Sequence, residues 1–209
     1  TFVHFCMEAT NVYHELVAFT LLENKNFKVS VVNPRRVKSY SKSIVNTKND
    51  KTDAKVLAQF CKERNPKQFT PQTKERRELR DLSRLMDNLV ELRIMQKVRL
   101  QTFNTEAAAR VVKSTIKSIE NTIAETEEEI KYYYDNYPEL KQEYELLNSI
   151  PSFGKRVSNV LISEIYKDEY GMYNSKKLTA FFGLEVREAE SGSSVWQKPR
   201  ITKFGNPRV

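Results

Sequence analysis

The hydrophobic pattern in the N-terminal third of the chain predicts strands and helices in alternation. Residues 2–7 form a short apolar run that ends at Glu8, and residues 27–32 alternate as in a half-buried strand. Helical patterns fall between these strands, over residues 12–23, and after them, over residues 52–64. The order strand, helix, strand, loop, helix indicates an α/β unit, the second half of a sheet whose first strands are absent.

The borders of these elements carry their own signals. We expect residues 9–11 to cap the first helix, and Asn33-Pro34 to end the second strand. A polar, basic linker is predicted between that strand and the second helix. Four positions spaced as one face predict the buried side of that helix: Ala54, Leu57, Ala58 and Cys61.

The middle of the chain has a different period. Leucines recur in steps of three and four from Leu79 to Leu92, and a similar spacing runs from Val112 to Ile130 with one gap. No glycine occurs there, and no proline lies between Pro71 and Pro138. These features predict two long antiparallel helices, a coiled-coil arm over residues 71–147, with a break near residues 104–109.

Residues 148–209 are predicted to form a third, helical part. Ile150-Pro151, a turn at Gly154 and an apolar helix after it follow the pattern of a helix–hairpin–helix, whose turn offers backbone N–H groups to a phosphate. Phe181-Phe182-Gly183-Leu184 closes another helix. The remainder, from Glu190 onward, reads as a basic loop that contains glycine.

Composition narrows the class of protein. The chain has 209 residues and a net charge of +8, with 39% hydrophobic and 30% charged residues, which is typical of a helix-rich globular protein. Its apolar runs are far too short to span a bilayer, so no membrane partner is expected. Cys6 and Cys61 match no zinc spacing and are expected to be buried free thiols in a reducing cytosol.

Charge is unevenly distributed along the chain. Residues 28–67 hold eleven Lys or Arg and three acids, a net of +8, whereas residues 120–145 hold nine acids and two Lys, a net of −7. A basic segment of this kind favours a nucleic-acid partner. The candidate phosphate contacts are Arg35, Arg36, Lys38, Lys48, Lys51, Lys155, Arg156, Lys198, Arg200 and Lys203.

Two acids stand inside the basic segment. Asp50 and Asp53 are three residues apart, so on a helix they share one face and can hold one divalent ion. Carboxylates are hard oxygen ligands, which suit Mg²⁺ (or Mn²⁺), and such an ion can act on a phosphodiester. The alternative is that Asp53 caps its helix or pairs with Lys51 on a solvated surface.

Seven short motifs occur in an order that resembles a known family. They are Phe5-Cys6-Met7-Glu8-Ala9-Thr10-Asn11-Val12-Tyr13, Val31-Val32-Asn33-Pro34, Lys48-x-Asp50-x-x-Asp53-Ala54, Ile150-Pro151-x-x-Gly154, Phe182-Gly183-Leu184, Ser191-Gly192 and Ile201-Thr202-Lys203-x-Gly205-Asn206. The set is similar to the DEDD-type transposases of insertion-sequence family 110, relatives of the Piv invertases, over essentially the whole chain.

The resemblance implies a fold and an activity. It implies a partial RNase H/RuvC-like domain over residues 1–70, a coiled-coil insertion over 71–147, and a C-terminal transposase domain over 148–209. It also implies a bacterial enzyme of the cytoplasm and nucleoid that recombines donor and target DNA. A structured bridge RNA would guide it, and it would act as a homodimer or higher homo-oligomer through the coiled coil.

The resemblance also implies roles for the residues that match the family's motifs. Glu8, Asp50 and Asp53 match the last three of four metal-binding acids, and Ser191 matches the family's nucleophilic serine. The first acid is expected upstream of this chain, which is expected to be a fragment cut at both ends. Two departures from the family pattern affect local turns: Ser152-Phe153 in the hairpin, and Asn11 where glycine is common.

Three functions follow from these residues. The first is a serine recombinase, in which Ser191 attacks a phosphate that metal at Glu8, Asp50 and Asp53 polarises, with Arg200 and Lys203 as clamps. The second is a RuvC-like endonuclease that depends on metal alone. The third is a nucleic-acid-binding module without catalysis, because the chain lacks one metal acid.

Overall fold

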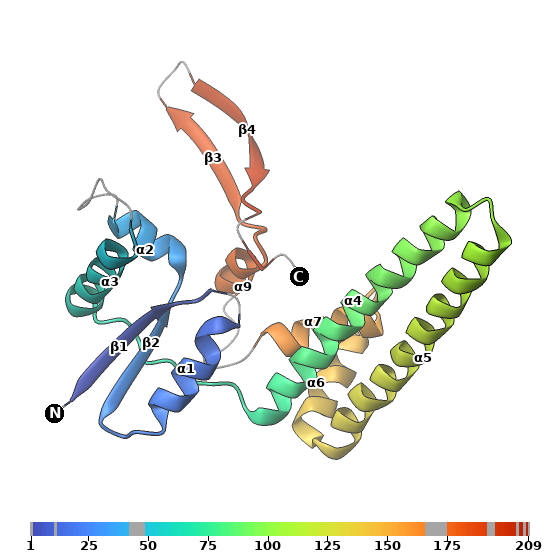
Figure 1. The fold of residues 1–209 in the computed structure, drawn as a ribbon. Coiled ribbons are helices and arrows are strands. Elements are labelled where there is room, and N and C mark those ends of the chain that lie inside the picture. The colour runs from blue at the N-terminus through green and yellow to red at the C-terminus, as the bar shows by residue number, and fades with distance from the viewer. Residues whose placement is uncertain are drawn as a thin grey trace. The chain divides into compact units, whose positions relative to one another are not determined.

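The computed structural model describes residues 2–10, 12–41, 49–165, 175–191, 195–203, 205–206 and 208. For residues 187–191 and 195–197 it describes the backbone alone. The chain divides into two compact units, residues 1–71 and residues 72–209 (Figure 1). The architecture is mostly helical with a small parallel sheet, which agrees with the predicted α/β plus α class.

The first unit begins with two parallel strands joined by a helix. β1 (Val3–Glu8) pairs with β2 (Phe27–Val32), and α1 (Tyr13–Leu22) connects them (Figure 1). The predicted cap of α1 is wrong, because Val12 occupies the N-cap position and its side chain makes no capping bond. The Tyr13 N–H bonds instead to the Thr10 carbonyl at 3.2 Å, while Asn11 lies outside the described residues.

The predicted basic linker begins with a helix instead, α2 (Pro34–Ser41). The Asn33 side chain accepts a hydrogen bond from the Arg35 N–H at 2.9 Å, and proline suits the first position of a helix. Val37 and Tyr40, three residues apart, are buried on the inner face. Only two apolar side chains mark this helix among charged neighbours, so its short pattern was masked by the charge of the segment.

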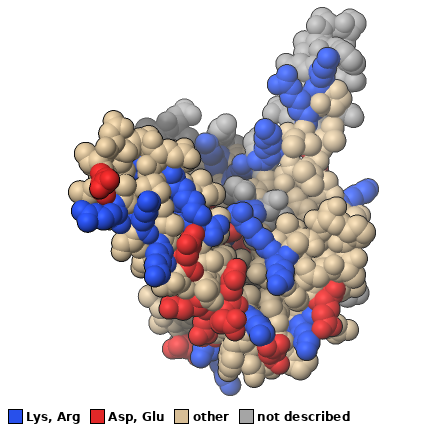
Figure 2. Space-filling view, turned by 90° about the vertical axis from the view of Figure 1, so that its right-hand side faces the viewer, with Lys and Arg blue, Asp and Glu red and all other residues tan. Residues whose placement is uncertain are grey.

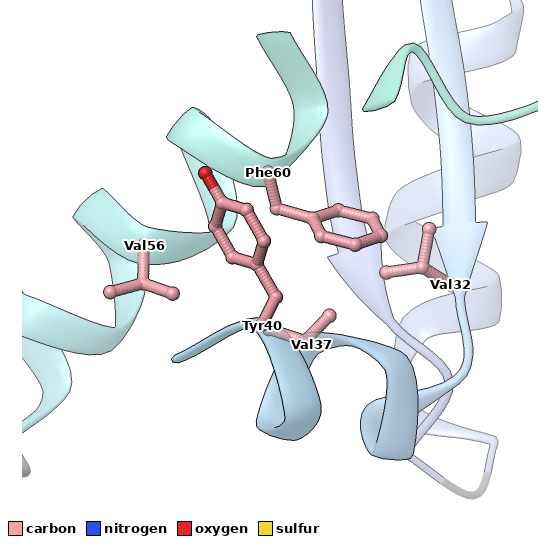
Figure 3. Close-up of a cluster of buried hydrophobic side chains, with 5 residues drawn as sticks. All are labelled: Val32, Val37, Tyr40, Val56 and Phe60. Atoms are coloured by element: carbon pink, nitrogen blue, oxygen red, sulfur yellow. The ribbon is translucent and has the colours of Figure 1, made fainter. Parts of the chain in front are cut away.

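Helix α3 (Asp50–Arg64) covers the same core. Its buried residues are Val56, Phe60 and Cys61, whereas Ala54 and Ala58 of the predicted apolar face are exposed. Figure 3 shows Val56 and Phe60 pointing toward Tyr40, Val37 and Val32 of β2. The larger side chains set the rotation of the helix, because burying valine and phenylalanine removes more apolar surface from water than burying alanine.

The polypeptide after α3 runs along β2. The Phe69 N–H bonds to the Val29 carbonyl at 2.7 Å, and the buried Ser30 hydroxyl donates to the Pro66 carbonyl at 3.0 Å. Because the Ser30 hydroxyl donates its proton to Pro66, its oxygen accepts a hydrogen bond from His4 Nε2 at 2.8 Å. Burial and, secondarily, the nearby Lys28 lower the pKa of His4, which therefore stays neutral at pH 7.

The second unit is built on a helical hairpin. α4 (Lys74–Thr102) and α5 (Glu106–Asn136) lie side by side over most of their length (Figure 1), and the predicted break falls at residues 103–105. Ile116, Ile123 and Ile130 are buried, as the period of the sequence predicts. Within the described residues, no helix is long and apolar enough to cross a membrane.

Two shorter helices close the base of this hairpin. They are α6 (Pro138–Asn148) and α7 (Lys155–Glu164), joined by the predicted turn. A buried cluster joins all four helices, with one or more residues from each: Leu79, Ile130, Tyr134, Leu140 and Ile162. Burial raises the pKa of Tyr134 above its ordinary value, and its hydroxyl donates to the Asn159 side chain at 2.8 Å.

The C-terminal part contains a β-hairpin where a loop is predicted. α9 (Ser175–Phe181) is closed two residues later by Gly183, which has a φ of 68°, and the Leu184 N–H bonds to the Thr179 carbonyl at 2.9 Å. β3 (Val186–Ser191) then pairs antiparallel with β4 (Val195–Ile201). β3 mixes Val186 and Ala189 with four polar or charged residues, and β4 places Val195 directly before Trp196, so neither strand shows the alternation that marks a half-buried strand.

The turn between α6 and α7 contains one left-handed residue. Ser152 has a φ of 74°, a region that glycine enters without steric cost and other residues do not. This is the position where the sequence departs from the glycine expected in the hairpin.

Replacing Ser152 with glycine should therefore stabilise the protein. We expect Ser152→Gly to raise the free energy of unfolding by about 0.5–1 kcal/mol, because relief of the left-handed strain exceeds the entropy that glycine adds to the unfolded chain. Denaturant unfolding measures this change in the free energy of unfolding. Ser149→Gly is the matched control, since Ser149 has an ordinary φ of −72° and gains nothing from glycine. Equal effects of the two substitutions would contradict the assignment of strain to Ser152.

Candidate functional site

Glu8 is the last residue of β1. It lies at the carboxyl end of the parallel pair, opposite Val32 of β2, and its side chain is half-buried. In open α/β sheets, this end of the strands is where ligands bind. The sequence therefore predicts an acid where the topology favours a site.

Two cysteines lie beside this strand end. Cys61 of α3 is buried, Cys6 of β1 is half-buried, and both are free thiols. Burial, and then the Cys61 thiol and the Glu8 carboxylate, raise the pKa of Cys6 to about 12. The Cys6 thiol is therefore protonated at neutral pH, so the nearby oxygen ligands, and not this sulfur, are suited to a divalent cation.

Asp50 and Asp53 occupy the first turn of α3. The Asn49 side chain caps this turn by accepting from the Thr52 N–H at 2.9 Å, so neither aspartate serves as the cap. Both aspartates are exposed. Among described residues, neither carboxylate accepts a hydrogen bond or pairs with a cation, although Lys51 lies between them. Acids left without a cation in a basic segment are available to an added metal ion.

The three acids do not converge in this structure. Within the described ranges, no group of three or more His, Cys, Asp or Glu side chains is placed to hold a metal ion. α3 meets β1 near Cys61, and Asp53 precedes Cys61 by eight residues, or about 12 Å of helix. The donor set fits Mg²⁺ in its chemistry, while its assembly around one ion stays a prediction.

Ser191 is the last residue of β3. Its backbone pairs with Val195 across the hairpin, and its side chain lies outside the described part of the structure. Residues 192–194 lie outside the described residues as well. The side chains of Lys198 and Arg200 on β4 are exposed, as is Lys203 beyond the hairpin.

The predicted phosphate-binding turn precedes α7. Gly154 is the N-cap of this helix, and Lys155 and Arg156 are exposed in its first turn. Arg156 also binds within the protein, because its Nε donates to Asp87 Oδ1 of α4 at 2.8 Å. This bond fixes the guanidinium beside the helix N-terminus and leaves its outer edge facing solvent.

The remaining candidate cations lie on the first unit. Arg35, Arg36 and Lys38 are exposed on α2, and Lys51 is exposed on α3. Lys48 lies outside the described residues. Because Val37 and Tyr40 turn into the core, α2 presents its cations outward as one surface.

Sequence reasoning missed a cluster of charged residues in the second unit. Asp87 and Glu164 are two nearly buried carboxylates, with side chains 12% and 7% exposed. They bind Arg84, Arg156 and Arg208, which come from α4, α7 and the C-terminal segment. An isolated Asp or Glu within an amphipathic helix carries no signal of such a partner 121 residues away.

Comparison with known proteins places these residues in a family. Residues 1–107 match a family model named DEDD_Tnp_IS110 and described as a transposase. Residues 144–209 match a second one, described as the transposase IS116/IS110/IS902 family. The chain belongs to the IS110-type transposase family. The predicted resemblance to insertion-sequence family 110 is thereby confirmed.

Two curated relatives match this transposase-family chain along its length. The chain is 29% identical over 212 residues to the pilin gene-inverting protein of Moraxella bovis and, equally, to that of Moraxella lacunata. The match covers 99% of the chain and 64% of each relative. The chain thus spans slightly less than two thirds of the length of these proteins.

The exposed cations of β4 provide a test of DNA contact by this transposase-family chain. We expect Lys198→Gln and Arg200→Gln to weaken DNA binding, and each to reduce the slope of log K against log salt by about 1, because each lost phosphate contact releases one counterion fewer. Fluorescence anisotropy over a salt series measures this slope. Lys141→Gln, which removes an exposed lysine from the acidic segment, is the matched control. An unchanged slope in the β4 variants would argue against phosphate contacts there.

Proposed function

We propose that this chain is part of a DNA transposase, an enzyme that cuts and rejoins DNA through a serine nucleophile. The observation that carries the proposal is the match of both ends of the chain to transposase families. Support comes from the position of Ser191 at the end of a β-hairpin whose other strand carries exposed cations. Of those cations, Lys198 lies nearer to the tip, whereas Arg200 pairs with Arg187 toward the base.

The proposed chemistry is transfer of a phosphodiester to serine. The Ser191 oxygen forms a bond to phosphorus, its proton is lost to a base, and the bridging oxygen of the DNA leaves as a hydroxyl. The strand is then held as a phosphoserine ester, so the bond energy is kept for rejoining. A second DNA hydroxyl reverses these steps and restores the serine. Arg200 is paired with Arg187 and Lys203 is bonded to Gly183, so both lie toward the base of the hairpin and are candidate contacts to DNA phosphates away from Ser191.

We propose that Glu8, Asp50 and Asp53 hold Mg²⁺ or Mn²⁺. When bound, the ion supplies positive charge that polarises the scissile phosphate. Support comes from the chemistry of the donors and from the lack of cation partners for Asp50 and Asp53 among described residues. The parallel β1–β2 pair, with Glu8 at its carboxyl end, is consistent with an RNase H/RuvC-like domain.

The proposed partners are donor and target DNA and a structured guide RNA in the bacterial cytoplasm, with association at the nucleoid. The exposed cations of α2 form one candidate surface, and the Lys155–Arg156 turn forms another. Helix N-termini and basic side chains contact phosphates without reading sequence. Such surfaces suit a protein whose sequence specificity comes from a paired RNA.

The arm of α4 and α5 is proposed to join copies of the chain. Near its tip, Leu92, Ile94, Met95 and Val98 of α4 are exposed, Ile94 and Val98 at 55% and 56%. On the same turns, the partly buried positions are 93, 96 and 100, on the side toward α5. α4 therefore carries an apolar face directed away from its own partner helix, as a helix does when it packs on a further helix.

Charge favours a second copy of the arm on that face. The distal part, residues 91–119, holds six Lys or Arg and two acids, a net of +4, whereas residues 120–145 have a net charge of −7. Figure 2 shows Asp and Glu gathered in the lower part of the visible face, with Lys and Arg mainly above them. Two antiparallel arms would place each basic tip against the acidic base of the other.

Charged residues on the apolar face should therefore separate the copies. We expect the chain to sediment as a dimer or larger oligomer, and the double variant Ile94→Asp/Val98→Asp to sediment as a monomer, because burying two carboxylates costs several kcal/mol. Leu16→Asp, at a leucine of the first unit that is 76% exposed, is the control. A monomeric wild type, or an oligomer that the double variant leaves intact, would contradict self-association through the arm.

The proposed serine chemistry predicts a covalent complex. With the full-length protein, its element RNA, Mg²⁺ and a labelled DNA that carries the element junction, we expect a protein–DNA adduct that survives denaturation. Ser191→Ala should abolish it, because the substitution removes the proposed attacking oxygen. Gel electrophoresis of denatured samples measures the adduct.

Ser193→Ala is the matched control, two residues away in the same sequence. Cleavage without an adduct, unchanged in Ser191→Ala, would favour the endonuclease that depends on metal alone. DNA binding without cleavage by the full-length protein would favour the non-catalytic module.

A further inference from the structure

The base of the β3–β4 hairpin is tied to the end of α9 by backbone hydrogen bonds. The Thr202 N–H donates to the Glu185 carbonyl at 2.8 Å, and the Lys203 N–H donates to Gly183 at 2.9 Å. The Asn206 N–H donates to the Phe181 carbonyl at 2.7 Å. The segment after β4 is thus bonded to the segment between α9 and β3.

Close backbone contact at Gly205 strengthens this attachment. A Cβ at this position would lie 2.1 Å from the Gly183 nitrogen and 2.2 Å from the Phe181 carbonyl oxygen. Both are backbone atoms, which cannot swing aside as a side chain can. Glycine is therefore the only residue that allows the two segments to touch.

The segment continues from there to the helical body. Asn206 Nδ2 donates to Glu164 Oε2 at 3.0 Å. Arg208 Nη2 donates to Asp87 Oδ2, and Arg208 Nε lies 3.3 Å from Glu164 Oε1. Arg208 therefore joins the last turn of α7 to the middle of α4.

Each of the two carboxylates also holds a cation from the helical body. Glu164 accepts two hydrogen bonds from Arg84, at 2.9 and 3.0 Å, and Asp87 accepts one from Arg156 at 2.8 Å. Arg208 is the group that both carboxylates share, and it comes from outside the helices. Nearly buried carboxylates need such partners, since an uncompensated charge there is costly.

From these contacts we infer that Asn206 and Arg208 are positioning residues for the serine-bearing hairpin. They hold its base against α4 and α7, and through Asp87 they tie it to the Lys155–Arg156 turn. The hairpin and the proposed phosphate-binding turn are thus fixed to one carboxylate. Any consequence for catalysis rests on the proposed role of Ser191, whereas the attachment of the hairpin to the helices does not.

Hydrogen exchange of the full-length protein tests whether Asn206 and Arg208 attach the hairpin to the helices. We expect Arg208→Gln to speed amide exchange in residues 183–206 about tenfold or more, with exchange in α5 unchanged. The reason is that the hairpin would open locally while the arm of α4 and α5 stays folded. Arg208→Lys should lie between wild type and Arg208→Gln, since an ammonium keeps the charge but cannot span two carboxylates as a guanidinium does. Arg110→Gln removes an exposed arginine of α5 and should change neither region.

Asn206→Ala removes one side-chain bond and should produce the same regional pattern to a smaller degree, even if Arg208→Gln does not fold. Exchange in residues 183–206 that stays at the wild-type rate in both variants would overturn the inference. Exchange that rises equally in α5 would overturn it too, because the residues would then stabilise the whole unit.

The adduct assay tests the catalytic consequence separately. Arg208→Gln should slow adduct formation tenfold or more while the Kd for DNA changes less than about twofold, because binding surfaces remain and only alignment is lost. Equal losses in affinity and rate would overturn a positioning role in catalysis. If Ser191→Ala retains the adduct, the proposed function fails, and the exchange pattern still decides whether Arg208 fixes the hairpin.

Discussion

Burial of Leu79 is the constraint on which the second unit depends. This side chain has no exposed surface, and it packs in a cluster to which α4, α5, α6 and α7 each contribute. Neither long helix could bury its apolar side alone, and the two short helices have too few turns to be stable in isolation. The cluster fixes the lower end of the arm, the turn before α7, and the carboxylates of Asp87 and Glu164 relative to one another.

Charge in this protein is sorted between surface and interior. The cations of α2 and β4 face solvent, where a polyanion can reach them, whereas Arg84 and Arg208 are engaged with carboxylates inside the second unit. A net charge of +8 does not distinguish these two uses. Aspartate shows the same division, since Asp87 is nearly buried and paired while Asp50 is exposed without a described partner. Surroundings, more than residue type, decide which charges can serve a ligand.

Most elements with a clear period were predictable from sequence. The apolar runs that become β1 and β2, and the isoleucine spacing of α5, are local patterns that the structure keeps, whereas Leu85 and Leu92 of the leucine period are exposed. α2 was missed because charged side chains obscure its short apolar pattern, and the β3–β4 hairpin because its strands lack a regular alternation. Packing of Val37 and Tyr40 on α3 could not be inferred from either helix alone. Of the candidate site, the position of Glu8 at the end of its strand follows from sequence, whereas Ser191 was expected in a loop and is instead the last residue of β3. Their mutual arrangement does not follow from sequence, since it depends on contacts between distant segments.

The contact between Asp87 and Arg208 has a consequence for the order of folding. It joins residues 121 positions apart, the longest separation among the ion pairs described for this chain, whereas Leu79, Ile130 and Ile162 meet over shorter loops. Closing a longer loop costs more chain entropy, and synthesis delivers residue 208 after all the helices. The four-helix body can therefore collapse before the C-terminal segment arrives. The hairpin is then docked last, as a completed part on a surface already formed.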